Sequence, residues 1–342
     1  MANVTGPASS TDNAILRWDG TAGDKIQNSG LVITDSNNLQ STGGDSRGSN
    51  ATDLQVARDY QTQAASGVGS VISGGANNTA YGEYSTVGGG YGNSAGSGIS
   101  TVAGGDTNLI SAEWSFIGGG DHNSIGVGAH YSTIAGGQNN SIEEGMLLNT
   151  IAGGGANEIS AGDYGAIGGG RSNEVAANYG TVPGGYQAKA DKYGQVATAS
   201  GCFSVTGDAQ TSRFTVRKST SNATPTELAL DGVGTTFKFT IAAGASWAFH
   251  GTVVGRDSSG NSACWEIKGG IKNVSGTTSL IGSPTVSLLG ADAAAVTAGW
   301  GVVGAISVTA DNTNDSLKIT VTGAASSNIR WVASLRTSEV SY

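Results

Sequence analysis

Residues 85–95 read Ser-Thr-Val-Gly-Gly-Gly-Tyr-Gly-Asn-Ser-Ala, and nine variants of this phrase occur between Ile72 and Val196. Aligned on their Val or Ile, successive copies lie 14 to 17 residues apart. The aligned residues are Ile72, Val87, Val102, Ile117, Ile134, Ile151, Ile167, Val182 and Val196. A fixed short period is typical of stacked repeats, in which no single unit buries a core alone. The sequence therefore predicts a repeat β-roll or β-helix shaft filled by these Val and Ile side chains.

Glycine and asparagine repeat with the same period. Gly-Gly follows the aligned residue in eight copies and suits a tight corner with positive φ. The recurrent asparagines are Asn78, Asn93, Asn108, Asn123, Asn140, Asn157 and Asn173. Because Asn tolerates left-handed backbone and bonds to its own turn, we expect these side chains to form a turn ladder. A unit this short has room for two strands of four or five residues and two turns, which favours a narrow two-sided roll.

A third column lies three residues before each aligned Val or Ile. Its members are Tyr84, Ile99, Trp114, Tyr131, Leu148, Tyr164, Tyr179 and Tyr193. Because the roll interior is already filled, we expect association of identical chains to bury this stripe, with a homotrimer as the arrangement that suits a shaft. Stacking of sugar rings on the aromatic members is the alternative. The predicted subunit interface is Tyr84, Trp114, Tyr131, Tyr164, Tyr179 and Tyr193.

The chain before the repeats is polar, with two β-like runs at 14–18 and 31–34. The dipeptides Asp19-Gly20 and Ser29-Gly30 are typical of turns. Residues 51–65 have a weak helical period of apolar positions, which predicts one short helix. We assign residues 1–69 to an N-terminal region and 70–207 to the glycine-rich shaft.

Residues 208–342 have a different pattern, in which apolar and polar side chains alternate. Phe237–Ile241 and Leu317–Val321 alternate strictly, and 258–261 and 311–315 resemble hairpin turns. Eight to ten short strands fit, which predicts an antiparallel β-sandwich or jelly roll and an all-β chain overall. We expect most of its tryptophans in the core and one or two on the surface. These are Trp247, Trp265, Trp300 and Trp331.

Composition excludes several classes of function. The formal net charge of −9 disfavours nucleic acid and anionic membranes as partners. Cys202 and Cys264 are the only cysteines and match neither a disulfide framework nor a metal motif. No signal peptide and no run of 18 apolar residues is visible, so we expect synthesis in a cytosol and no membrane insertion.

The sequence offers little for catalysis. Glu143 and Glu144 are neighbours whose side chains point apart, and they do not form the spaced pair that cleaves polysaccharides. No nucleophile, zinc or phosphate-loop motif is present. We expect His122, His130 and His250 on loops or the surface rather than on a metal. The prediction is a protein without catalytic, cofactor-binding or metal residues that is not an enzyme.

Three parts of the chain resemble known families. The repeats resemble the glycine-rich head repeats of trimeric adhesins, which form left-handed parallel β-rolls. Residues 3–14, 17–20 and 26–30 are similar to the N-termini of bacteriophage tail fibre proteins. Residues 207–214, 223–228 and 329–333 resemble C-terminal domains found on phage and prophage fibres.

This resemblance implies a viral structural protein, a trimeric tail fibre located in the virion tail and synthesised in the host bacterial cytoplasm. Such a fibre attaches to a tail or baseplate protein through its N-terminus and adheres to host surface polysaccharide or protein towards its C-terminus. A bacterial trimeric adhesin and a polysaccharide-cleaving tailspike are the alternatives. Several weak contacts would combine by avidity.

Overall fold

The protein is described here from a computed structural model, which defines residues 14–18, 26–33, 39–41, 47–234 and 236–342. The chain forms two compact units, Met1–Ala156 and Asn157–Tyr342. Nearly all regular structure is β, as predicted. The helices of the described residues are α1 (Ala293–Thr297) and a 3-10 turn at Val303–Ala305.

The first unit begins with β1 (Ala14–Trp18), β2 (Ile26–Ile33) and β3 (Leu39–Ser41), which pair antiparallel in that order. The turn predicted at Ser29-Gly30 is wrong, because this dipeptide lies inside β2. Residues on both sides of it are paired, to β1 and to β3, so the backbone between them stays extended. Asp19-Gly20 lies outside the described residues.

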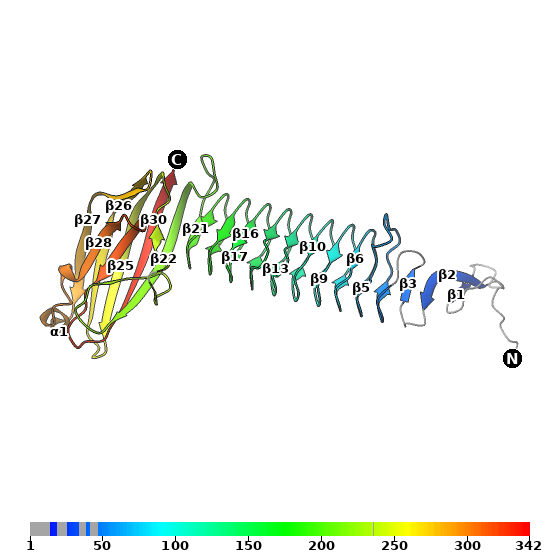
Figure 1. The fold of residues 1–342 in the computed structure, drawn as a ribbon, viewed down its shortest axis with the longest axis horizontal. Helices are drawn as coiled ribbons and strands as arrows, with labels where there is room; N and C mark the ends of the chain where they lie inside the picture. The colour runs from blue at the N-terminus through cyan, green and yellow to red at the C-terminus, as the bar shows by residue number, and fades with distance from the viewer. Residues whose placement is uncertain (1–13, 19–25, 34–38, 42–46, 235) are drawn as a thin grey trace. The chain divides into compact units, whose positions relative to one another are not determined.

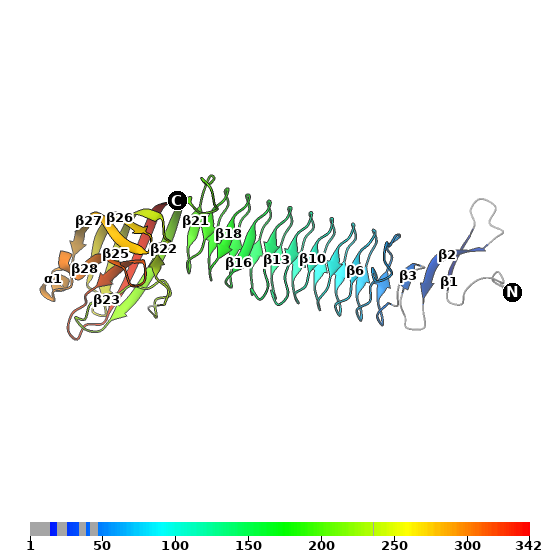
Figure 2. The same cartoon turned by 45° about the horizontal axis from the view of Figure 1, so that its top comes forward.

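Stacked coils make up the rest of the first unit (Figures 1 and 2). One parallel sheet consists of β4 (Thr52–Asp53), β5 (Val71–Ile72), β7 (Thr86–Val87), β9 (Thr101–Val102), β11 (Phe116–Ile117), β13 (Thr133–Ile134) and β15 (Thr150–Ile151). The second consists of β6 (Thr79–Ala80), β8 (Ser94–Ala95), β10 (Leu109–Ile110), β12 (Ser124–Ile125) and β14 (Ser141–Ile142). A third column of single-residue bridges runs through Ala76, Tyr91, Asp106, Asp121 and Gln138.

Each coil therefore has three paired columns and strands of two residues, not the two longer strands predicted. The Gly-Gly corner explains the short strands. Gly90 has a φ of 86°, and a Cβ atom there would lie 2.1 Å from the carbonyl oxygen of Gly105 in the next coil. Only glycine allows the chain to bend so closely against its neighbour.

The aligned Val and Ile residues point into the coils. Ile72, Val87, Val102, Ile117, Ile134, Ile151, Ile167 and Val182 are at most 1% exposed. Strand residues next to them, such as Thr86 and Thr133, point outward and are half-buried. In each two-residue strand, therefore, one side chain points into the coil and the other points outward.

The predicted asparagine column lies inside the coils as well. In the first unit, the backbone N–H groups of the last four asparagines (Asn93, Asn108, Asn123 and Asn140) each donate to the side-chain oxygen of the asparagine one coil earlier, at 2.9 to 3.1 Å, and that of Asn78 donates to Gln55 Oε1 at 2.8 Å. The left-handed backbone is on the preceding residue, for example His122 at φ 54° and Asn139 at φ 55°. Asparagine's role is therefore internal hydrogen bonding and not the turn conformation that we expected.

The short helix predicted over 51–65 is not formed. Thr52–Asp53 is β4, and Asp53 lies opposite Ile72 in the interior column. Its carboxylate is fully buried and paired with Arg47 Nε at 3.2 Å and Arg58 Nη2 at 2.8 Å. The Ala65 N–H also donates to it. Bonds to the next coil outweigh a weak local helical period.

The second unit continues with coils formed by β16 (Glu158–Ala161), β17 (Ala166–Ile167), β18 (Glu174–Ala176), β19 (Thr181–Val182), β20 (Lys189–Ala190) and β21 (Val196–Thr198). Thr181 is opposite Val196, so Ala197 and not Val196 occupies the interior position. Ala197 is fully buried and Val196 is half-buried. The last repeat was therefore aligned one residue too early, on Val196 instead of Ala197, and its true length is 15 residues and not 14.

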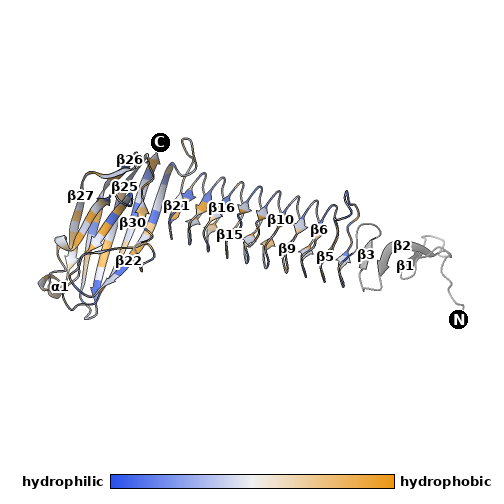
Figure 3. Cartoon of the chain, viewed as in Figure 1, coloured by the Kyte–Doolittle hydropathy of each residue, from blue (hydrophilic) through white to orange (hydrophobic). Residues whose placement is uncertain are grey.

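Residues after the coils form two antiparallel sheets. Five long strands lie in the order β22 (Ala209–Thr220), β30 (Ile329–Ser341), β25 (Ala245–Asp257), β26 (Ser262–Val274) and β27 (Thr277–Ala291). The small sheet contains β23 (Thr226–Glu227), β24 (Phe239–Thr240), β28 (Ile306–Asp311) and β29 (Ser316–Val321). Hairpins join strands at 258–261 and 311–315, as predicted. Figure 3 shows polar and apolar residues alternating along the long strands.

Side chains from both sheets share one hydrophobic cluster. Trp265 and Trp300 each place their ring centroids 5.6 Å from that of Trp331. The Trp331 ring N–H donates to Thr220 Oγ1 at 2.9 Å, and the Trp265 ring N–H donates to the Val302 carbonyl at 3.0 Å. With Trp247 at 4% exposed and the other three at 0%, the prediction of one or two surface tryptophans is wrong.

Candidate functional site

An exposed column of large side chains lies along the coils of each unit. Tyr84, Ile99, Trp114, Tyr131 and Leu148 belong to the first unit, and Tyr164 and Tyr179 to the second. All seven are 44 to 58% exposed. A contiguous apolar row of this kind on a protein surface is typical of an interaction site.

The backbone of this column is strained. All seven residues have φ between 52° and 59°, a left-handed conformation that bulky side chains rarely adopt. The Tyr84 N–H donates to the Val68 carbonyl at 2.8 Å and the Tyr179 N–H to the Asp163 carbonyl at 2.9 Å, so bonds between coils hold the conformation. Glycine would avoid the strain, which suggests that the side chains serve a purpose outside the single coil.

Aromatic members of the column stack on one another. The rings of Trp114 and Tyr131 lie 5.0 Å apart at an interplanar angle of 5°, and Tyr164 and Tyr179 repeat this arrangement. Offset stacking contributes roughly 0.5–1.5 kcal/mol per pair. The result is a row of flat aromatic faces spaced by the coils.

Tyr193 departs from the column to which the sequence assigned it. The left-handed position in its coil is Gly194, at φ 65°, because the register shifts by one residue at Val196. Tyr193 instead packs against Tyr179 and Phe237, with ring centroids 5.1 and 4.8 Å away. It is half-buried within its own chain, so its assignment to the subunit interface is not supported by the geometry.

The candidate acids and histidines of the sequence lie at separate places. Glu143 and Glu144 are exposed, and Glu174 pairs with Lys189 at 2.9 Å. The His130 Nδ1 atom accepts a bond from the Glu113 backbone at 3.1 Å. None of these contacts assembles a pair of carboxylates around a common space.

A carboxylate pair from different coils is present elsewhere in the first unit. Asp106 and Asp121 are directly bridged neighbours in the third column, between Tyr91 and Gln138. Neighbouring strands lie about 4.8 Å apart, so these side chains start side by side. Hydrogen bonds from His122 and then Gln138 lower the pKa of Asp121. This pair was not among the acids considered from the sequence, which lie mostly in or beside the variable loops; the aligned position four residues after Val102 and Ile117 was the available signal.

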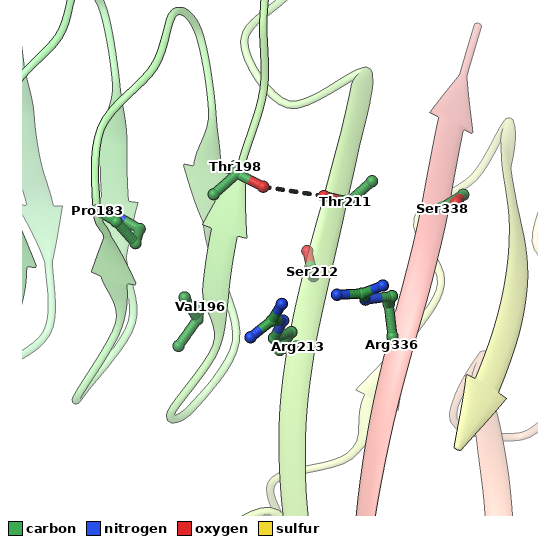
Figure 4. Close-up of a pocket in the computed structure, with 8 residues that line it drawn as sticks. All are labelled: Pro183, Val196, Thr198, Thr211, Ser212, Arg213, Arg336 and Ser338. Atoms are coloured by element: carbon green, nitrogen blue, oxygen red, sulfur yellow. Dashed lines mark hydrogen bonds between the residues drawn. The ribbon is translucent and has the colours of Figure 1, made fainter.

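A pocket of about 600 Å³ in the second unit lies between β21 and the long strands β22 and β30 (Figure 4). Its lining includes Pro183, Val196, Thr198, Thr211, Ser338 and two arginines, Arg213 and Arg336. Thr198 and Thr211 share a hydrogen bond of 2.9 Å between their hydroxyl oxygens. Figure 4 shows the Arg336 guanidinium extending from β30 towards β22, where Arg213 lies.

The loop before β22 is fixed by one carboxylate. Asp208 is buried and accepts bonds from the backbone N–H groups of Phe203, Ser204 and Val205. Burial alone would raise the pKa of Asp208, but these hydrogen bonds outweigh it and lower the pKa to about 2. The negative charge therefore persists at neutral pH and holds 203–208 in place beside β22.

Comparison with known proteins identifies no family. No family model matches the sequence, and no curated protein matches it. No helix within the described ranges is long and apolar enough to cross a membrane.

Two solved structures are similar to the chain, each at 9% sequence identity. The tailspike protein of Acinetobacter phage vB_ApiP_P1 has a TM-score of 0.19, with 91% of this chain and 79% of that chain covered. Tailspike gp49 of Acinetobacter baumannii bacteriophage Fri1, a capsular polysaccharide depolymerase, has a TM-score of 0.21, with 83% and 66% covered. At such TM-scores neither structure assigns a family to this chain.

The prediction that the chain is not an enzyme is corrected by this comparison. The gp49 structure is that of a depolymerase, which is an enzyme. The prediction rested on Glu143 and Glu144 as sequence neighbours and overlooked acidic residues that lie side by side on adjacent coils, such as Asp106 and Asp121. It is therefore withdrawn.

Proposed function

We propose that the chain is a receptor-binding protein of a bacteriophage tail, with residues 208–342 as the part that contacts the host. The observation that supports this proposal lies in the second unit, where the parallel coils continue directly into the domain of long strands. The last coil strand, β21, pairs with the first long strand, β22. The segments that resemble phage fibre domains, 207–214 and 329–333, overlap the paired strands β22 and β30. Host surface polysaccharide or protein is the proposed ligand, and residues 1–69 are the proposed attachment to the tail.

The proposed assembly is a homotrimer built on the exposed column. Seven large side chains, five in the first unit and two in the second, have exposed fractions near one half and offer apolar surface to a neighbouring copy. Removing such surface from water contributes about 25 cal/mol per Å². Three chains per fibre would also supply three host contacts, and avidity would multiply a weak individual affinity.

The test combines solution mass with cell binding. Light scattering of the purified full chain should give three chains per particle, and a pull-down with intact host cells should retain it. Removal of surface polysaccharide from the cells should abolish retention if the ligand is a glycan. A trimer that binds no cell of any tested host would contradict the receptor-binding proposal, and a monomer would contradict the assembly.

Tyr179→Gly separates the interface role of the column from a structural one. Glycine loses the ring contacts with Tyr164 and Tyr193 but relieves the left-handed strain at φ 58°, and because these effects oppose each other the unfolding free energy of the single chain should change by no more than about 1 kcal/mol. Loss of an aromatic face at a subunit contact should instead weaken the trimer at least tenfold. Light scattering over a dilution series measures the dissociation.

The matched control is Tyr186→Ala, which removes an aromatic side chain that is 42% exposed but lies in the bridge column. Its dilution series should overlay that of the unmodified chain. If the two variants dissociate at the same concentration, the column is not part of the subunit interface, and stacking of sugar rings on it becomes the favoured role.

Polysaccharide cleavage is the second candidate, and the bridged pair Asp106 and Asp121 is the observation that favours it. Retaining glycosidases hold two carboxyl groups about 5–5.5 Å apart, and the strand spacing of about 4.8 Å is close to that separation. The lowered pKa of Asp121 suits the ionised partner of such a pair. Tyr91, next to Asp106 in the column, offers an exposed ring for a sugar face.

Cleavage is measured as new reducing ends released from purified host polysaccharide. If this pair is catalytic, Asp106→Asn and Asp121→Asn should each lower the rate more than a hundredfold, while Glu144→Gln, an exposed acid nearby in sequence, should leave it unchanged. An unmodified chain that releases no reducing ends from a polysaccharide to which it binds would exclude the second candidate.

A further inference from the structure

Two arginines face each other in the long sheet without an acidic partner. Arg213 of β22 is directly opposite Arg336 of β30, and both side chains are exposed on the same sheet face. Like charges in directly opposed positions destabilise a strand pair. Within the described ranges, neither guanidinium forms an ion pair, whereas the exposed Lys268 does. An anion between the two would turn this repulsion into attraction.

The same row of the sheet carries two further basic side chains. His250 lies opposite Arg336 in β25, and Lys268 lies opposite His250 in β26. Glu266 binds His250 Nε2 at 2.9 Å and Lys268 Nζ at 3.1 Å, and the Lys268 bond followed by the His250 bond lowers its pKa. Glu266 thus neutralises the β25–β26 end of the row. The uncompensated charge lies at the pocket end, in a chain with a net charge of −9.

The pocket beside the two arginines combines polar and apolar walls. Thr198, Thr211 and Ser338 present hydroxyl groups, while Pro183 and Val196 present carbon surface. Its volume of about 600 Å³ lies within the range of roughly 300–1,000 Å³ typical of small-ligand sites. A sugar ring likewise has a polar edge, formed by its hydroxyl groups, and an apolar face, formed by its C–H groups.

We infer that this pocket binds an acidic sugar unit of a polysaccharide, with the carboxylate of a uronate between Arg213 and Arg336. Guanidinium groups bind planar carboxylates through two parallel hydrogen bonds, which lysine does not reproduce. The threonine hydroxyls then meet the sugar hydroxyls, and Pro183 and Val196 contact the ring face. The polymer as its source rests on the proposed host-binding function, whereas binding of the uronate itself does not.

The experiment is calorimetric titration of the full chain with a galacturonate trisaccharide and with its carboxyl-reduced, neutral counterpart. The acidic trisaccharide should bind at least tenfold more tightly than the neutral one. Arg213→Gln and Arg336→Gln should each weaken it at least tenfold. Lys272→Gln is the matched control, because Lys272 is an exposed cation of the same sheet outside the pocket and its loss should change affinity less than twofold.

Other outcomes overturn the assignment. Equal affinity for the neutral trisaccharide, or equal effects of Arg213→Gln and Lys272→Gln, would remove the carboxylate from the pocket. If inorganic phosphate binds the chain and the uronate does not, the ligand of the two arginines is a phosphate group and not a sugar carboxylate. A change of oligomeric mass in the arginine variants without any uronate binding would make the pair a subunit contact.

Whole-cell binding keeps this inference distinct from the proposed function. If the Arg213→Gln and Arg336→Gln variants bind host cells as well as the unmodified chain does, the host polysaccharide is not the source of the uronate, and the receptor-binding proposal stays intact. A chain that binds uronate through the arginines but binds no host cell would contradict the receptor-binding proposal and leave the pocket intact.

Discussion

Asn123→Asp should destabilise the first unit by more than about 4 kcal/mol, although the two side chains have nearly the same shape. The Asn123 amide nitrogen lies 3.1 Å from the Gly119 carbonyl, 2.9 Å from that of Gly137 and 3.0 Å from Asn108 Oδ1. Aspartate would place a second oxygen against these three acceptors in a site with no exposed surface. Each orphaned buried group costs roughly 1–3 kcal/mol, and the buried charge adds several more.

Urea unfolding of the full chain, followed by circular dichroism, measures this loss. Asn139→Asp is the control, because Asn139 is exposed, adopts φ 55° and is replaced by a residue that tolerates that conformation. Its unfolding free energy should change by less than about 0.5 kcal/mol. Similar curves for the two variants would contradict the internal asparagine ladder.

Ile134→Asp has the second large expected effect, the loss of soluble folded protein. Ile134 is fully buried between Ile117 and Ile151 in the interior column. The substitution removes a packed side chain worth about 2–5 kcal/mol and places an unpaired carboxylate in an apolar interior. Because a coil contacts only its neighbours, the damage separates the ladder into two shorter pieces.

Soluble yield and light scattering of Ile134→Asp measure this effect, with Thr133→Asp as the control. Thr133 is the adjacent strand residue and points outward, so aspartate there should leave a soluble, folded chain. If Ile134→Asp were to assemble normally, the inward assignment of the column would be wrong.

The coil interior was predictable because each position meets the same surroundings in every copy. Thus one Val or Ile per repeat located the buried column from Ile72 to Val182. Repetition also produced the errors. The last repeat was aligned on Val196 because it is a Val, although Ala197 occupies the interior position. Asp53 was overlooked as an interior residue because this position is hydrophobic in the other coils, and only its ion pairs with two arginines allow a charge there.

The candidate site was much less predictable. The exposed column could be read from its period, but its left-handed backbone could not, because that conformation is imposed by bonds from the neighbouring coil. Arg213 and Arg336 lie far apart in sequence and meet only through the pairing of β22 with β30. The alternation of apolar and polar residues over 208–342 was the available signal for outward-facing arginines, although no arginine was singled out from it, and it does not indicate which strands are adjacent.

Because every coil bonds to its neighbours in the same way, the number of coils, and with it the length of the stack, can change in evolution by one coil at a time. The Thr86 N–H donates to the Ser100 carbonyl at 2.9 Å, and one coil later Thr101 repeats the bond with Ser115 at 3.0 Å. Loss or duplication of one 15-residue block therefore leaves the flanking coils with equivalent partners and changes the reach by about 4.8 Å. Unequal recombination between such similar gene segments would supply these steps, so selection can adjust the distance spanned independently of the chemistry at either end.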